Sequence, residues 1–464
     1  MLNNRLLFLR IALSPLSDTV FIVVLFWVSL SSRRFRYTHI YTYELLLGFT
    51  SSMASEDYYG PCILYANKDN TVILIDIPRS IELAQGRTFM RRKLTSSKPP
   101  ELPFPSLEPK SAKAKARLLS PTCTLRDLVL RKILELALEQ VKDGHTGDWC
   151  GKRVYYHSPH TRKRKRETSE FSPAVSGHAA DSSTGISTVG DRSSTSTAGS
   201  MDALPRFVWD DTTTVHINRN LMEQCLRVSR GATREIMLPD CYIPPKAVFI
   251  IGDIMKTIDS FKQMAPRFDL VVMDPPWPNR SAERKGDYRT CYDAADVRGM
   301  LFSIPLVNHL TDDGVIAVWI TNKERFREML LDPSEEGLFN KWGVTLAEEW
   351  VWLKTTTSGE PVYPLKSTWR KPYEILLVGR RGHPTGKVLR RVIVGVPDLH
   401  SRKPNGKVLY EMMRNRVNKE VIKDKYQALE IFARNLTAGW WSWGMEPLKF
   451  QDISMWRDDR CRRS

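Results

Sequence analysis

The pattern that most constrains the fold is an alternation of short apolar runs with helical segments in the second half of the chain. The apolar runs have the length of buried strands, and turn-forming residues bound them. The expected strands are Ala247–Ile251, Leu270–Met273, Gly314–Trp319, Trp350–Leu353, Ile375–Gly379 and Val392–Gly395. The expected helices are Ala295–Leu301, Lys323–Leu331, Lys407–Asn415 and Lys423–Phe432. This alternation predicts an α/β fold with a Rossmann-like sheet.

The 464 residues leave room for further regions around that sheet. The expected parts are an N-terminal extension (1–52), an N-terminal accessory region of α+β character (53–156), a disordered basic and Ser/Thr-rich linker (157–203), the α/β domain (204–456) and a basic tail (457–464). The composition of the linker, above all residues 182–200, is too polar to form a packed core. The fold class is therefore α/β with a smaller N-terminal α+β region.

The accessory region has its own strand and helix signals. Thr71–Ile77 has the composition of a strand, and Leu125–Lys142 has helical signals at both ends. The apolar face of this helix needs a packing partner; its members include Leu128, Ile133, Leu136 and Val141. The region either docks on the α/β domain and helps to bind substrate, or it is a structural layer.

The first 52 residues allow more than one interpretation. Val20–Val28 is continuously apolar and lies between arginines, which is typical of a targeting signal or an anchor, but it is short for a bilayer span. Met53 is a plausible alternative start, and the residues before it would then be a non-functional extension. We favour the extension over a targeting segment and expect no membrane association.

The chain is strongly basic, with a formal net charge of +17. This charge indicates an anionic partner, for which nucleic acid is the natural candidate and an acidic membrane surface the alternative. The basic run 162–166 indicates nuclear import or an arm that binds phosphate, so we expect a nuclear protein, with or without a cytosolic pool. The seven cysteines form no CxxC pair, and we expect no metal site.

The segment Asp274-Pro275-Pro276-Trp277 directly follows the expected strand Leu270–Met273. Loops at the carboxyl ends of strands in α/β sheets bind ligands, and two consecutive prolines stiffen this loop. A carboxylate and carbonyls beside an indole suit a planar ring with an exocyclic amine, because the oxygens accept the amine hydrogens and the indole stacks on the ring. The alternative is a tight turn with an N-capping Asp and a core Trp.

Several further motifs accompany that segment in a fixed order. They are residues 370–374 (RKPYE), 397–404 (PDLHSRKP), 429–435 (LEIFARN) and 439–444 (GWWSWG). Together with Asp274–Trp277 they resemble the MT-A70 family of S-adenosylmethionine-dependent adenine-N6 methyltransferases, over roughly residues 241–456. The resemblance implies that Asp274, Pro275, Pro276 and Trp277 are catalytic and that S-adenosylmethionine is the methyl donor.

The resemblance also implies which residues bind the cofactor, although the chain has no GxGxxG loop. The carried-over positions are Gly252, Asp253, Ile254, Asp274, Lys371, Arg434, Asn435, Gly444 and Glu446. Lys371 is expected to contact either the cofactor carboxylate or a phosphate, and Glu374 to brace the same loop. Met445 and Leu436 depart from the family pattern, which places Asn at the first position and, in some relatives, His at the second. Packing of Trp440, Trp441 and Trp443 in the core is favoured over ligand contact.

The polymer that carries the adenine is less well defined than the methylated atom. A basic cluster after the motif, with one tyrosine, is expected to contact substrate: Arg280, Arg284, Lys285, Arg289 and Tyr292. The resemblance favours RNA, in particular small nuclear RNA with an internal 2′-O-methylated adenosine. DNA is the second candidate, and a non-catalytic RNA-binding scaffold is a weaker third. We expect a monomer.

Overall fold

The computed structural model divides the chain into two compact units, residues 1–58 and 59–464. It describes residues 62–86, 92–105, 124–155, 204–210, 214–231, 239–278, 293–367, 370–382, 386–399, 402–417 and 426–458, with the backbone of 9–12, 21–24 and 236–237. In the first unit, β1 (Leu9–Ala12) and β2 (Phe21–Val24) pair as antiparallel strands. The expectations for the basic run, the linker and residues 459–464 of the tail lie outside the described residues.

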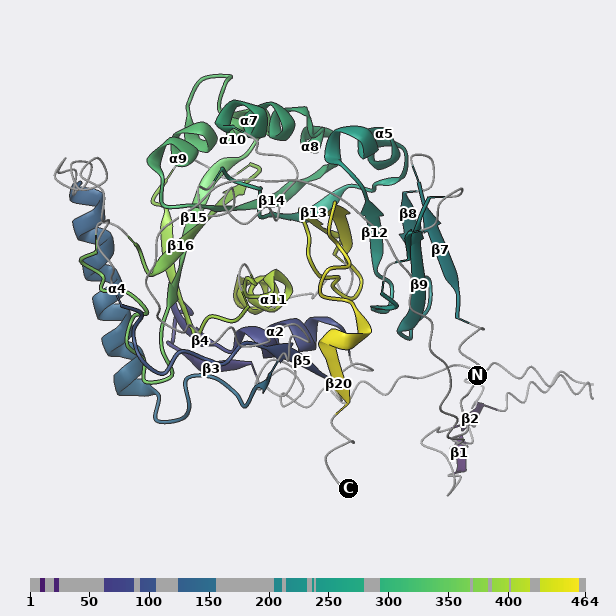
Figure 1. Cartoon of the computed structure of the whole chain (residues 1–464), viewed down its shortest axis with the longest axis horizontal. Coiled ribbons are helices and arrows are strands. Elements are labelled where there is room, and N and C mark those ends of the chain that lie inside the picture. The colour runs from purple at the N-terminus through teal and green to yellow at the C-terminus, as the bar shows by residue number, and fades with distance from the viewer. Residues whose placement is uncertain are drawn as a thin grey trace, which may run out of the picture. The chain divides into compact units, whose positions relative to one another are not determined.

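An 11-stranded sheet forms the centre of the second unit (Figure 1). Its strands, in spatial order, are β3 (Ile63–Ala66), β4 (Val72–Ile75), β17 (Leu389–Gly395), β15 (Thr345–Lys354), β16 (Tyr373–Arg380), β14 (Leu310–Ile320), β13 (Phe268–Met273), β18 (Ala428–Ile431), β19 (Trp441–Gly444), β12 (Val248–Ile251) and β8 (Val215–Ile217). The strands from β14 to β12 are mutually parallel, and β16 is antiparallel to both of its neighbours. This arrangement confirms the Rossmann-like α/β fold.

Helices cover both faces of the sheet. On one face lie α5 (Ile254–Met264), α7 (Ala294–Ser303), α8 (Leu306–His309), α9 (Glu324–Leu331) and α10 (Leu338–Lys341); on the other lie α2 (Ile77–Ala84) and α11 (Gly406–Val417) (Figure 1). Within β15, Val351 belongs to the core on the first face, and its neighbours Trp350 and Trp352 belong to the core on the second. This alternation is what a strand buried on both faces requires.

The expected strands of the α/β domain and three of its expected helices are confirmed, within a few residues at their ends. The expected helix Lys423–Phe432 is wrong, because its described part contains the strand β18. Ala428 pairs with β13, and Leu429 pairs with both β13 and β19. A helix there would leave the backbone groups of two buried strands without partners, which costs more than local helix propensity can offset. The sequence also gave no expectation of α5.

The accessory region is continuous with the large sheet. Its strand β4 is parallel to β17, with Val72 opposite Val392. A small separate sheet joins β5 (Arg92–Ser96) to β6 (Val154–Tyr155) and to β20 (Trp456–Asp458) at the other end of the chain. Residues 62–155 therefore share one compact unit with the α/β domain.

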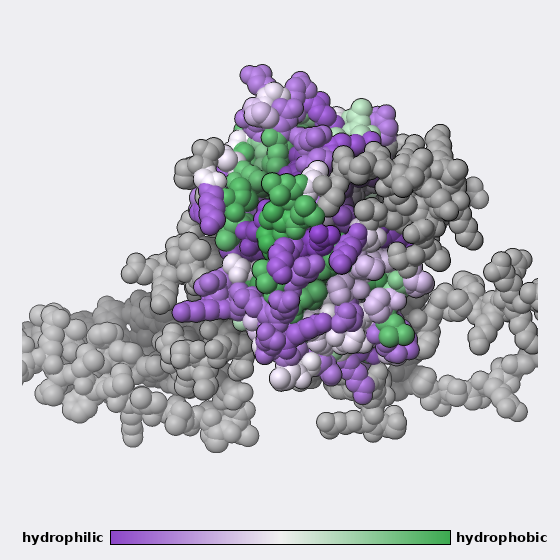
Figure 2. All heavy atoms as spheres, turned by 90° about the vertical axis from the view of Figure 1, so that its left-hand side faces the viewer, coloured by the Kyte–Doolittle hydropathy of each residue, from purple (hydrophilic) through white to green (hydrophobic). Residues whose placement is uncertain are grey.

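The long helix α4 (Leu125–Gly144) packs on β4 and β17, and its buried residues join the core on the first face of the sheet. A capping box between Thr124 and Asp127 fixes its start, as the sequence indicated. Val141 is buried, but Leu128 and Leu136 are 41% and 49% exposed, so the expected apolar face is only partly correct. The core side of the helix is instead formed by Leu130, Leu134, Ala137, Leu138 and Val141. Figure 2, which views this side of the molecule, shows hydrophobic surface where α4 exposes apolar side chains such as Leu128 and Leu136.

A separate sheet of four strands is not hydrogen-bonded to the 11-stranded sheet. It contains β7 (Arg206–Trp209), β9 (Gln224–Arg230), β10 (Ile236–Met237) and β11 (Cys241–Ile243). Among the described residues, no helix is both long and apolar enough to cross a bilayer. The same part of the chain holds no cluster of three or more His, Cys, Asp or Glu side chains suited to a metal ion.

Candidate active site

The sheet has a topological switch point between β13 and β18. These two strands are parallel neighbours, but β13 is followed in space by β14 on one side and β18 by β19 on the other. Connections that leave in opposite directions open a crevice at the carboxyl ends of the strands, where α/β proteins bind ligands. Asp274 follows β13 and Phe432 follows β18, so both lie at this edge.

The turn after β13 is fixed by bonds from Trp277. Its backbone N–H donates to the Pro275 carbonyl at 2.7 Å, and its indole Nε1 donates to the Trp319 carbonyl at 2.7 Å. The ring is 8% exposed and lies 4.5 Å, centroid to centroid, from Phe326 of α9. This geometry favours the alternative interpretation, in which Trp277 is a core residue that anchors the turn. The Pro275 carbonyl keeps a second lone pair for another donor.

Asp274 is part of a chain of alternating charges. Its Oδ2 lies 2.9 Å from Lys403 Nζ, which is also 3.0 Å from Glu374 Oε2, and Glu374 in turn pairs with Lys354. Burial alone would lower the pKa of Lys403, but the carboxylates of Asp274 and Glu374 raise that pKa above its usual range. Lys403 therefore stays charged at neutral pH, in direct contact with the Asp274 carboxylate.

Lys403 is a site residue that the sequence predictions omitted. It lies 129 positions from Asp274, within the motif 397–404, and no spacing rule connects the two. Lys371, which was expected to contact the cofactor carboxylate or a phosphate, lies near the start of α4, with its Nζ 3.9 Å from Asp127 Oδ1. The expectation that Glu374 braces its loop agrees with its pairs to Lys354 and Lys403.

Three neighbouring strands end in unusual backbone conformations at this edge. The φ angle is +62° at Phe432 after β18, +151° at Gly444 in β19 and +148° at Gly252 after β12. The Gly252 N–H donates to the Gly444 carbonyl at 2.9 Å. A Cβ at Gly444 would lie 3.1 Å from the Cα of Phe432, and one at Gly252 would lie 2.7 Å from Thr257. Both positions therefore require glycine, because these strand ends pack closely against their neighbours and have left-handed φ angles.

The other positions expected at the cofactor are found near these strand ends. Asp253 caps α5 by accepting the Met255 N–H at 2.9 Å, and the next residue, Ile254, is buried. Arg434 Nε lies 3.6 Å from Glu446 Oε2, just beyond β18 and β19 respectively. Asn435 donates to the Leu436 carbonyl at 3.3 Å. Met445 is 59% exposed, so it adds apolar surface at the position where the family pattern has Asn.

The residues expected to contact substrate lie outside the described part of the chain. They are Arg280, Arg284, Lys285, Arg289 and Tyr292, and the neighbouring Tyr288 lies there too. Their assignment remains a prediction.

Comparison with known proteins decides the family. The model of the MT-A70 family matches residues 268–446. An N6-methyladenosine RNA methyltransferase MTA1 from Cryphonectria parasitica is 37% identical over 407 residues, which cover 85% of this chain and 94% of that protein. The chain belongs to the MT-A70 family. Proteins of this family are adenine-N6 methyltransferases, and the edge that carries Asp274 is the candidate active site.

Other MT-A70 relatives match a shorter part of the chain. The N(6)-adenine-specific methyltransferase METTL4 of Mus musculus is 36% identical over 46% of this chain and 44% of its own length. A Caenorhabditis elegans protein named DNA N6-methyl methyltransferase is 33% identical over 45% of this chain and 54% of its own length. The similarity to MTA1 therefore extends well beyond residues 268–446, whereas that to the other two covers about half the chain.

We predict that Gly444→Ala weakens both the fold and cofactor binding. The new methyl group would meet the backbone of Phe432, and the φ angle disfavours any side chain, which together should cost about 1–3 kcal/mol. Denaturant unfolding and titration with S-adenosylmethionine measure the two effects. Gly299→Ala in α7 is the matched control, because nothing lies within 4 Å of its new Cβ. Equal results for both variants would contradict this account.

Glu430 of β18 gives a prediction for pH dependence. Burial, and to a smaller extent the nearby Asp274 carboxylate, raise the pKa of Glu430 to about 8. A carboxyl group that binds its proton more tightly when folded loses stabilising free energy as pH rises from its unfolded pKa, about 4.3, towards 8. Between pH 5 and pH 8 the unfolding free energy of the wild type should therefore fall relative to that of Glu430→Gln, which has no ionisable group at this position.

Denaturant titrations at several pH values test this expectation. Glu335→Gln serves as the control because Glu335 is an exposed carboxyl on the same protein. Profiles of wild type and Glu430→Gln that run parallel from pH 5 to pH 8 would show that Glu430 is ionised at neutral pH.

Proposed function

We propose that this protein transfers the methyl group of S-adenosylmethionine to N6 of adenosine in RNA. The observation that carries the proposal is Asp274 at the switch point, with its Oδ2 2.9 Å from Lys403 Nζ. The choice of RNA is supported by the similarity to MTA1, which spans 85% of this chain. As the finer substrate we propose small nuclear RNA with an internal 2′-O-methylated adenosine, on the likeness of the catalytic motifs.

The residues of the site account for the chemistry by positioning and charge. The lone pair of the N6 amine is delocalised into the ring, so the amine is a poor nucleophile. Asp274 and the Pro275 carbonyl accept hydrogen bonds from the amine, which favours a tetrahedral nitrogen and stabilises the positive charge that develops on it. Trp277 and Pro276 keep these acceptors in place. The amine proton can leave after transfer without a strong base.

The site also fits the cofactor that MT-A70 methyltransferases generally use. S-adenosylmethionine supplies an electrophilic methyl group when it is bound. Its methionine end carries an ammonium and a carboxylate, which Asp274 and Lys403 complement in charge. Gly252 and Gly444 keep the backbone at this edge free of side chains, and the pair Arg434–Glu446 supplies donors and acceptors for ribose hydroxyls.

A methyl-transfer assay with matched substrates tests the proposal. The purified protein is given labelled S-adenosylmethionine with RNA and DNA oligonucleotides of the same sequence, and with RNA whose target adenosine carries or lacks a 2′-O-methyl group. We expect label in RNA, and more of it with the 2′-O-methylated target. Label in DNA alone would establish the second candidate, which the Caenorhabditis elegans relative favours. No label in either polymer would favour the scaffold. We further propose that the protein acts in the nucleus as a monomer.

A further inference from the structure

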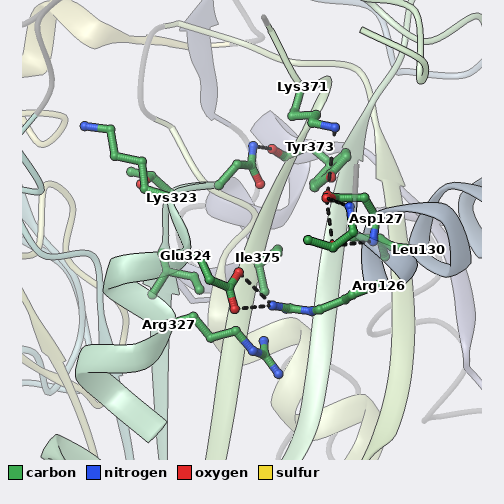
Figure 3. A pocket seen from close by; sticks show the side chains of 13 residues that line it. Arg126, Asp127, Leu130, Lys323, Glu324, Arg327, Lys371, Tyr373 and Ile375 are labelled. Atoms are coloured by element: carbon green, nitrogen blue, oxygen red, sulfur yellow. Dashed lines mark hydrogen bonds and ion pairs between the residues drawn. The ribbon is translucent and has the colours of Figure 1, made fainter. Parts of the chain in front are cut away.

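A shallow pocket lies where the start of α4 meets the carboxyl end of β14 and the start of β16 (Figure 3). Its volume is about 430 Å³, including the solvent at its mouth. It is lined from the accessory region by Thr124, Arg126, Asp127 and Leu130, and from the α/β domain by Ile320, Thr321, Asn322, Lys323, Glu324, Arg327, Lys371, Tyr373 and Ile375. The two regions therefore build this pocket jointly.

The pocket shares a wall with the catalytic turn. Lys323, in the loop between β14 and α9, lines the pocket and donates from Nζ to the Pro278 carbonyl at 2.8 Å. The same loop follows the end of β14, where Trp319 accepts the indole N–H of Trp277. The loop at Lys323 therefore joins the pocket to the turn that follows Asp274.

The charges of the pocket favour an anion. Its lining has four cationic side chains, Arg126, Lys323, Arg327 and Lys371, and two carboxylates, Asp127 and Glu324. The amino-terminal end of the 20-residue helix α4 adds partial positive charge. The pocket therefore keeps a positive excess even after its internal ion pairs are counted.

The ion pairs within the pocket occupy the arginine side chains but leave Lys371 able to bind a ligand. Arg126 donates to both oxygens of Glu324 at 3.0 Å and to the buried Glu349 at 3.1 Å, and Arg327 also binds Glu349. These contacts hold the walls in place. Lys371 lies 3.9 Å from Asp127, which is too long for a hydrogen bond, so its ammonium keeps donors for a ligand. The Thr321 hydroxyl is buried in the pocket wall without a hydrogen-bond partner.

We propose that this pocket binds a backbone phosphate of the RNA next to the target adenosine, with Lys371 as the main contact. The inference rests on the proposed function and adds a subsite to it. A phosphate fits better than a base, because the aromatic residue of the pocket, Tyr373, is only 6% exposed. The methionine carboxylate of the cofactor has a different partner in Lys403, beside Asp274. Phosphate contacts of this kind set the register of a nucleic acid without reading its sequence.

Steady-state kinetics of Lys371→Gln test the subsite. Loss of one charged contact should raise KM for the RNA oligonucleotide about fivefold to tenfold, on every sequence alike. The slope of log KM against log salt should fall by about 0.7, the value for one phosphate on a single strand. The kcat at saturating RNA and the Kd for S-adenosylmethionine should stay at wild-type values. Lys371→Arg, which keeps the charge, should restore most of the affinity.

A matched control and three outcomes make the test decisive. Lys262→Gln removes an exposed lysine of α5, which does not line the pocket, and should leave all constants unchanged. If wild type transfers label but Lys371→Gln keeps its KM and salt slope, the phosphate subsite is wrong. If Lys371→Gln instead loses affinity for S-adenosylmethionine, Lys371 is a cofactor residue and the subsite is again wrong. If wild type transfers no label to RNA, the proposed function itself fails.

Discussion

Asp274→Ala should transfer methyl groups at least about a hundredfold more slowly than the wild type while it remains folded. The carboxylate sits at the end of β13, where Lys403 holds it 2.9 Å away before any substrate binds. Alanine removes the acceptor for the N6 amine, and it also removes the charge that balances Lys403. Both losses act on the transition state, in which positive charge develops on the amine nitrogen, so kcat should fall more than affinity for RNA.

The control for this variant lies at the other end of the same strand. Asp269 of β13 accepts the backbone N–H of Gln427 at 2.8 Å, far along the strand from the catalytic edge. Asp269→Ala is expected to lower stability but to leave the rate per folded molecule unchanged. Asp274→Asn should lie between alanine and wild type, because its amide keeps one acceptor oxygen without the charge. Wild-type label transfer by Asp274→Ala would end the proposed mechanism.

The sequence predicted local features well because local patterns carry them. The apolar runs of β12 to β17 have buried faces on both sides, and the capping box of α4 involves residues three positions apart. The prediction for the four-residue strand β18 was wrong because its strand conformation depends on pairing with β13 and β19. Neither pairing can be read from the local sequence. A short apolar run cannot be assigned to a strand or a helix by periodicity alone.

The candidate site shows the same limit. Asp274 could be found because a rigid acidic turn after a strand has a chemical meaning by itself. Lys403 could not, since its role depends on a contact across 129 positions. The contact of Lys371 with the start of α4 could not be predicted either, because no local pattern connects that part of the accessory region to the segment before β16. The choice between a stacking and a core Trp277 could not be made from the sequence, because the bond from its indole to Trp319 joins two different strand ends.

The accessory region is expected to be essential for the stability of the whole unit. Asp398, in the segment that leads to Lys403, is buried with two guanidinium groups. Its Oδ2 lies 2.6 Å from Arg402 Nη1, and its Oδ1 lies 3.9 Å from Arg153 and accepts the Ser97 N–H at 2.8 Å. Arg153 and Ser97 belong to the accessory region, so this carboxylate ties that region to the segment that carries a site residue.

Asp398→Ala should therefore lower the unfolding free energy by about 3–5 kcal/mol, because it leaves two buried cations without their counter-ion. Arg402 already has donors without partners in the core, so no local group can take over the lost contact. The matched control is Asp312→Ala. Asp312 also lies 2.6 Å from an arginine, Arg267, but its side chain is 92% exposed, so no measurable change is expected. Denaturant unfolding compares the two variants.

The fraction of Asp398→Ala that stays folded should also bind S-adenosylmethionine more weakly, since Lys403 follows Arg402 directly. Equal stability of the two variants would show that the accessory region is not held by this buried carboxylate.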